Sequence, residues 1–189
     1  MINICKGDKL MSTNSMILDQ ISPTSFVVDI PDTDYTKGLI LQVQGVTLPG
    51  INIPVSTVSL NSVLPAHIPG SAIEFDPLIL RIAVDSELES YFGLYKWMTG
   101  IVNYMDQSHS LRWLENDMSM AVHIMNTSKT KVLCTFRFYG VWVSNVGELD
   151  LTYTDDSEEV VTCMATFNFK YMEIEKNGVT IKPEPRKRK

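Results

Sequence analysis

The segment from residue 160 to 170 constrains the fold most, because apolar and polar side chains alternate along it with a period of two. A strand with this period buries one face and exposes the other. We therefore predict a long strand over "VVTCMATFNFKYMEIE", residues 160–175, with one face on a core. The apolar face holds Val161, Cys163, Ala165, Phe167 and Phe169, and the other face holds Thr162, Met164, Thr166, Asn168 and Lys170.

Further segments have strand-like composition and are separated by turn residues. Pro54 lies in one of them and cannot donate a ladder hydrogen bond, so that strand should lie at a sheet edge or a bulge. Residues 61–72 hold two prolines and a glycine and are expected to form an irregular connection, and 155–159 a charged turn. The predicted strands cover residues 25–31, 39–50, 51–60, 73–85, 119–126, 132–143 and 148–155.

One helix is predicted after residue 85. Ser86 is a suitable N-cap, Glu89 completes a capping box, and Gly100 is a natural terminator. The expected buried face has helical spacing and is mostly aromatic, with Trp97 nearby; it comprises Leu88, Tyr91, Phe92, Tyr95 and Met98. The predicted fold class is mainly β, an antiparallel sandwich or barrel with this α-helix packed on it.

Length and cysteine content limit the class of protein. The 189 residues suit one domain with its own core, and no apolar run approaches the roughly 20 residues of a membrane-spanning helix. The first twenty residues lack an apolar core flanked by positive charge, so no secretory signal is expected. Cys5, Cys134 and Cys163 are odd in number and widely spaced, which indicates free thiols in a reducing compartment rather than disulfides or a zinc site.

Charge is unevenly distributed along the chain. The net charge is −6, but residues 182–189 hold five basic residues and one acid, +4 in all, which leaves −10 for the rest. An acidic body argues against a protein that reads nucleic acid with a basic face. The basic tail is expected to be solvated, with contact to DNA or to an acidic partner as alternatives.

No pattern indicates a catalytic, cofactor-binding or metal site. The carboxylates of residues 155–159 sit in a solvated turn, and His67, His109 and His123 are scattered. Nucleophile elbows and phosphate-binding glycine loops are both missing from the sequence. A thiol–imidazole pair of Cys134 and His123 is the enzymatic alternative, and a thiol-modifying reagent would test it.

Two segments resemble the tail tube proteins of contractile-tailed, T-even-like phages. "FYGVWVSNVGELDLTYTDDSEEVVTCMATFNFKYMEI", residues 138–174, is similar to their C-terminal part, where a strand leads into a G-[LV]-W-x-[ST]-N-[VL]-G-E-L-like turn. "FDPLILRIAVDSELESYFGLYKWMTGIVNY", residues 75–104, resembles their strand followed by one aromatic helix. The resemblance covers a β domain over residues 24–175 and leaves a lead-in, 1–23, and a basic tail, 176–189, outside it.

This resemblance implies a structural, non-enzymatic role without a cofactor. Six subunits would form a ring whose hairpins join into a barrel around a channel, assembled in the host cytoplasm and carried in the virion tail. In its chain length and in the acidic start of its predicted helix, the sequence is most similar to the members that terminate the tube and stabilise the end of the sheath. The implied partners are its own copies in a homo-hexamer, the tail tube protein and sheath or neck proteins, with DNA only as passing cargo and no membrane.

Three other functions stay open. The chain could be the main tube subunit or a baseplate initiator ring. In another class, a small-ligand β-barrel could use the aromatic helix to cover a pocket, and such a protein could be monomeric. A tail ring protein could not function as a monomer, so the oligomeric state separates these classes.

A turn-like segment carries the candidate contacts. Apolar side chains beside a turn and rimmed by polar residues mark interfaces. The alternative is that Trp142 fills the base of its own sandwich. A second candidate surface is the polar face of residues 160–170, which suits a channel wall as well as any half-exposed sheet. The candidate inter-subunit or inter-ring contacts are Trp142, Val143, Asn145, Val146, Gly147 and Glu148.

Overall fold

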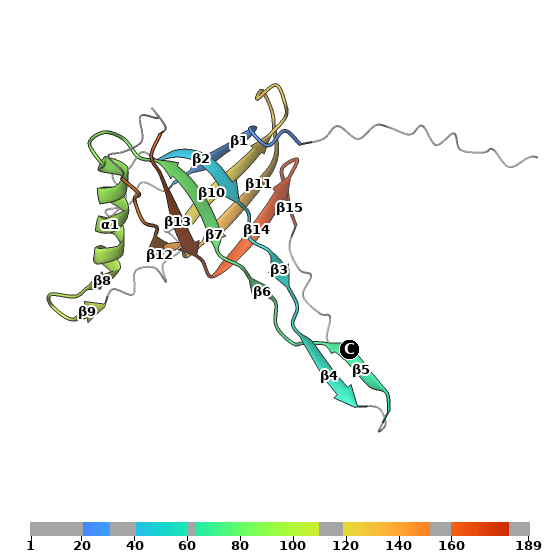
Figure 1. Cartoon of the computed structure of the whole chain (residues 1–189). Coiled ribbons are helices and arrows are strands. Elements are labelled where there is room, and N and C mark those ends of the chain that lie inside the picture. The colour runs from blue at the N-terminus through green and yellow to red at the C-terminus, as the bar shows by residue number, and fades with distance from the viewer. Residues whose placement is uncertain (1–20, 31–40, 60–62, 110–118, 152–159, 182–189) are drawn as a thin grey trace, which may run out of the picture.

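Two antiparallel sheets pack face to face, with one helix beside them, in the computed structural model (Figure 1). The structure describes residues 21–30, 41–59, 63–109, 119–151 and 160–181. The first sheet has the order β1 (Phe26–Asp29), β10 (Ser119–Met125), β11 (Val132–Tyr139), β14 (Tyr171–Lys176) and β15 (Val179–Ile181). The second has the order β12 (Trp142–Val146), β13 (Thr162–Asn168), β7 (Leu78–Ala83) and β2 (Gln42–Thr47). The predicted mainly β fold with one helix is confirmed.

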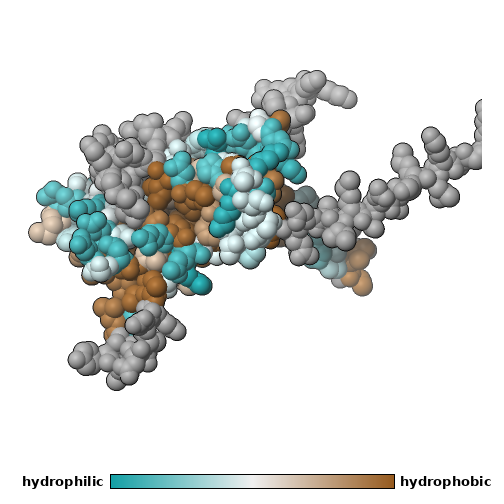
Figure 2. All heavy atoms as spheres, turned by 90° about the horizontal axis from the view of Figure 1, so that it is seen from above, coloured by the Kyte–Doolittle hydropathy of each residue, from teal (hydrophilic) through white to brown (hydrophobic). Residues whose placement is uncertain are grey.

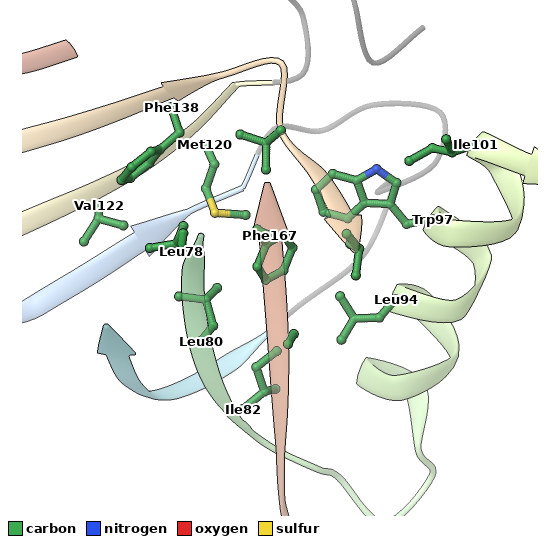
Figure 3. Close-up of a cluster of buried hydrophobic side chains, with 13 residues drawn as sticks. Leu78, Leu80, Ile82, Leu94, Trp97, Ile101, Met120, Val122, Phe138 and Phe167 are labelled. Atoms are coloured by element: carbon green, nitrogen blue, oxygen red, sulfur yellow. The ribbon is translucent and has the colours of Figure 1, made fainter. Parts of the chain in front are cut away.

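The core lies between the two sheets and extends under the helix (Figure 3). The period-two prediction for β13 is confirmed, because Cys163, Ala165 and Phe167 are buried while Thr162 and Met164 are exposed. The first sheet supplies Met120, Val122 and Phe138 to the same cluster, and β7 supplies Leu78, Leu80 and Ile82.

Two of the predicted strands, 132–143 and 160–175, are each two strands in different sheets. The segment 132–143 bends at Gly140, whose φ is +64°, and 160–175 bends at Phe169 and Lys170. The two bends meet, because the Lys170 N–H donates to the Tyr139 carbonyl at 2.9 Å. A Cβ on Gly140 would come within 2.8 Å of the Lys170 side chain. Alternation continues through the corner, so the sequence period did not reveal it.

A two-stranded arm replaces the irregular connection that was expected over residues 61–72. β4 (Val55–Ser59) pairs with β5 (Pro65–Pro69), and the two prolines stand at the ends of β5. Proline is tolerated there because an edge strand need not donate on both sides. The arm is joined to the body by β3 (Ile51–Asn52) and β6 (Glu74–Phe75) and projects away from it (Figure 1).

Other boundaries also differ from the sequence predictions. The strand expected over 148–155 is absent from its described part, residues 148–151, and the charged turn lies outside the described residues. β14 ends at Lys176 and β15 lies wholly after residue 175, where the domain was expected to end. Residues 1–20 and 182–189, most of the expected lead-in and tail, are also outside the described part.

The helix α1 (Glu89–Ile101) begins three residues later than the predicted N-cap. The Ser86–Glu89 capping box is wrong, because the Asp85 carboxylate caps instead: it accepts from the N–H groups of Glu89 and Ser90, both at 3.1 Å. The Ser90 N–H is the largest cause of the lowered pKa of Asp85, since hydrogen bonds favour the charged form. Gly100 lies inside the last turn rather than after it.

The helix buries a different face from the predicted one. Leu94, Trp97 and Ile101 point into the core, and Ser90 completes this face (Figure 3). Phe92 and Tyr95, members of the predicted stripe, are 50% and 48% exposed. Two stripes with helical spacing coexist on α1, and only packing against β12 and β13 decides which of them is buried.

Candidate assembly surfaces

The predicted contact segment is an edge strand rather than a turn. Among the described strands, β12 pairs with β13 alone, and it starts directly after the corner at Gly140. A bulge separates Val143 from Asn145, which are opposite Phe167 and Thr166. An edge strand leaves one row of backbone groups available for another chain. The prediction of a turn is thus wrong, whereas the strand's position at a sheet edge suits an assembly surface.

The structure separates the predicted contact residues into two groups. Val143 is buried in the core, and Trp142 and Val146 are half-buried against it. Asn145 and Glu148 are exposed. The Gly147 N–H donates to the Met164 carbonyl at 2.6 Å, and a Cβ at Gly147 would come within 2.9 Å of the same oxygen, so a side chain there would displace the strand.

Sequence reasoning missed a pocket beside β12. It has a volume of about 370 Å³ and lies between β12, the C-terminal half of α1 and β8 (Val102–Asn103), which pairs with β9 (Ser108–His109). The hydroxyls of Tyr95 and Tyr104 are 3.1 Å apart at its rim, and their hydrogen bond is the first cause of the raised pKa of Tyr95. Trp142 forms part of the wall. The signal in the sequence was the second aromatic stripe of the helix.

The outer face of the second sheet is almost uncharged and combines polar side chains with Met164, which is 53% exposed. Thr162 and Thr166 face outward in register with Ala83 and Ile79, as the sequence predicted for this face of β13. Arg81 is the one charged side chain in the four strands, all of which are described. The first sheet differs, since its outer face holds an ion pair between Arg137 and Glu175 at 3.1 Å.

Nothing in the described residues supports the thiol–imidazole alternative. His123 Nδ1 lies 2.9 Å from the Thr135 hydroxyl, and His123 is opposite Thr135 in the register, not Cys134. Burial raises the pKa values of both Cys134 and Cys163, which disfavours the reactive thiolate. Within the described ranges, three or more possible metal ligands never cluster, and no helix is long and apolar enough to cross a membrane.

Apolar side chains nevertheless reach the surface in many places (Figure 2). Several of them lie around the pocket: Tyr95, Val102 and Tyr104 are 48%, 49% and 65% exposed. Exposed apolar groups that gather at one place mark interaction surfaces. The pocket and the adjacent edge strand β12 therefore form the first candidate assembly surface, and the arm forms the second.

Trp142→Ala tests the two interpretations of the predicted contact. Because the indole is half-buried against the core and also walls the pocket, we expect the free energy of unfolding to fall by about 1–3 kcal/mol and oligomers to weaken. Phe92→Ala removes a more exposed aromatic outside the pocket and is the control for the loss of an aromatic side chain from the surface. Thermal melting and native mass spectrometry measure both effects, and intact oligomers with normal melting would contradict both interpretations.

Comparison with known proteins gives consistent matches. The family model for the T4-like virus tail tube protein gp19 matches residues 22–173. The tail tube terminator protein of Enterobacteria phage T4 is 36% identical over 167 residues, which are 87% of this chain and 94% of that protein. The tube-terminating cap of the anti-feeding prophage has a TM-score of 0.63 at 14% identity, covering 89% of this chain and 99% of that one. The sheath/tube terminator of the PVC extracellular contractile injection system has a TM-score of 0.61 at 13% identity, covering 82% and 96%.

Proposed function

Because the chain belongs to the T4-like virus tail tube protein gp19 family, we propose that it forms a hexameric ring that terminates the tail tube and stabilises the end of the sheath. The observation that carries this proposal is the 36% identity to a tail tube terminator across almost its whole length. The chain is thus a structural component of a contractile tail, located in the virion, and we propose that the ring assembles in the host cytoplasm. The main tube subunit and the baseplate initiator ring are the other roles within the family.

The second sheet offers a route to a closed ring. Its edges are β12 and β2, and successive strands run antiparallel across it. If β2 of one subunit pairs with β12 of the next, the antiparallel pattern continues across the junction. Six four-stranded sheets joined in this way close into one barrel and leave no free edge.

The outer face of that sheet then lines the channel. The threonines of β13 and the glutamines of β2 hydrate well and have no charge. DNA passing through would meet few fixed positive charges, since Arg81 is the single charged strand residue there. The wall we propose is therefore largely neutral, and the acidic residues of the chain lie elsewhere than on its strands.

A small-ligand β-barrel finds no support inside the sandwich. Such a protein needs an open space between its sheets. Here that space is filled by large, fully buried side chains such as Leu78, Phe138 and Phe167 (Figure 3). The pocket that the structure does show lies outside the sandwich, at the end of the helix.

Electron microscopy of the purified protein, with and without pre-formed tail tubes, tests the proposed function. We expect single rings that attach to one end of each tube and stop its growth when fresh tube subunits are added. Native mass spectrometry should show six copies per ring. Long tubes formed by the protein alone would indicate the main subunit, and persistent monomers that ignore tubes would rule out the ring.

A further inference from the structure

We propose that the two strands of the arm, β4 and β5, dock through their apolar face into the pocket beside β12 of the neighbouring subunit in the same ring. This inference rests on the ring proposed above and names the surfaces that would hold it together. The occupant of the pocket is thus the arm of a second copy of this chain.

The arm has two different faces. In the β4–β5 register Val58 is opposite Ala66, and Ser56 is opposite Ile68, so these side chains share one face. Val58 and Ile68 are 43% and 45% exposed. The other face is mixed: it has Val55, 65% exposed, near the base of the arm, and Thr57, whose hydroxyl lies 3.4 Å from a ring nitrogen of His67. Neither strand holds an acidic residue, a lysine or an arginine, so no such charge opposes apolar docking.

Val58 and Ile68, on the apolar face of the arm, stay partly exposed in the subunit. β4 and β5 form a two-stranded sheet, and no other strand in the described part of the chain pairs with them. A two-stranded hairpin is marginally stable in water, and it needs a further surface for its apolar face. The arm's base is fixed, because the Gly70 N–H donates to the Pro54 carbonyl at 2.7 Å. A fixed base and a partly exposed apolar face suit a hairpin that contacts another chain.

The pocket and the arm of one subunit cannot meet. The pocket lies at the end of α1 beside β8, and the arm projects from the opposite side of the body (Figure 1). A contact between them must therefore join two copies through different surfaces. Such a heterologous contact repeats from copy to copy and closes into a ring when the rotation allows it.

The strand directions place the two surfaces together in the proposed ring. β12 starts at Trp142, in the wall of the pocket. β2 ends at Thr47 and leads through β3 into the arm. Since β2 and β12 run in opposite directions, pairing them across a junction brings the end of β2 beside the start of the neighbour's β12. The arm thus leaves one subunit at the end where the next subunit has its pocket.

Cross-linking tests the contact directly. A chain with both Val58→Cys and Tyr95→Cys, treated with a short bifunctional thiol reagent, should give a ladder of covalent products up to the closed ring. The pair Val58→Cys and Val27→Cys is the matched control, because Val27 is as exposed as Tyr95 but lies on β1, away from the pocket. The parent chain, with its own Cys5, Cys134 and Cys163, gives the background.

Mixing two variants that each carry one added cysteine tests whether the cross-link joins the arm of one subunit to the pocket of another. If the chain with Val58→Cys and the chain with Tyr95→Cys are assembled together, each supplies one half of the junction, so covalent dimers and no longer products should form. Val58→Asp should weaken assembly at least about tenfold, whereas Thr57→Asp on the opposite face should not. Melting temperatures confirm that both variants are folded.

Native mass spectrometry of the same samples distinguishes the two proposals. Rings with the expected ladder support the docking. Rings without a ladder above background overturn the docking and leave the ring intact. Monomers that give no ladder of cross-linked products overturn the ring and the docking together.

Discussion

Phe167→Ala is expected to lower the free energy of unfolding by about 3–5 kcal/mol, the usual cost of removing a large buried aromatic. Phe167 is fully buried on β13, the strand that connects β12 and β7. Its ring centroid lies 5.7 Å from that of Trp97, so it also holds the helix against the sheet. The change leaves a cavity where the two sheets and the helix meet (Figure 3).

Met164→Ala is the control for this prediction. Met164 lies on the same strand but faces outward and is 53% exposed, so the change should stay within about 0.5 kcal/mol. Urea titrations followed by tryptophan fluorescence measure both, and an unchanged slope shows that the unfolded state is comparable. Equal effects of the two substitutions would mean that β13 does not divide the inside from the outside as the structure shows.

Removal of the arm is expected to weaken ring assembly while the body stays folded. Residues 55–69 can be replaced by an Asn-Gly turn, since the Pro54 carbonyl and the Gly70 N–H are already 2.7 Å apart. No described residue of the arm belongs to the core cluster, so the free energy of unfolding should change by less than about 1 kcal/mol. Assembly should require at least about tenfold more protein, which corresponds to roughly 1.4 kcal/mol.

Thr57→Ala is the control for the arm, because it removes the hydroxyl that contacts His67 and leaves the apolar face in place. Native mass spectrometry over a dilution series and thermal melting should show normal rings for this variant. Rings that form equally well without the arm would show that the arm is not a subunit contact. Loss of melting cooperativity together with the rings would instead make the arm part of the subunit's own fold.

The local patterns of the sequence predicted the β class, the single helix and the two faces of β13. Each depends on a short repeat: two residues for a strand and 3.6 for a helix. The resemblance to tail tube proteins also rested on contiguous segments, residues 75–104 and 138–174, and the family match confirms it. These conclusions required no knowledge of which strands are neighbours.

Apart from the N-cap of α1, where Asp85 caps residues only four and five positions away, the main errors share one cause, because they concern contacts between distant residues. The corner depends on Gly140 and Lys170, thirty positions apart, and the alternation runs through it unchanged. The arm forms because β4 pairs with β5, although the prolines at the ends of β5 had indicated a loop. The choice between Trp97 and Tyr95 as the buried side of α1 depended on the surface that the helix meets.

The sequence by itself determined that this chain is a β protein with one helix and a member of the tail tube family. The tertiary structure decided where its assembly surfaces lie. Tyr95 and Trp142 meet in one pocket wall although 47 positions separate them, and the arm lies far from both. Periodicity shows which face of an element is apolar, but burial, and therefore which apolar groups stay available to a partner, follows from packing between elements that no local repeat encodes.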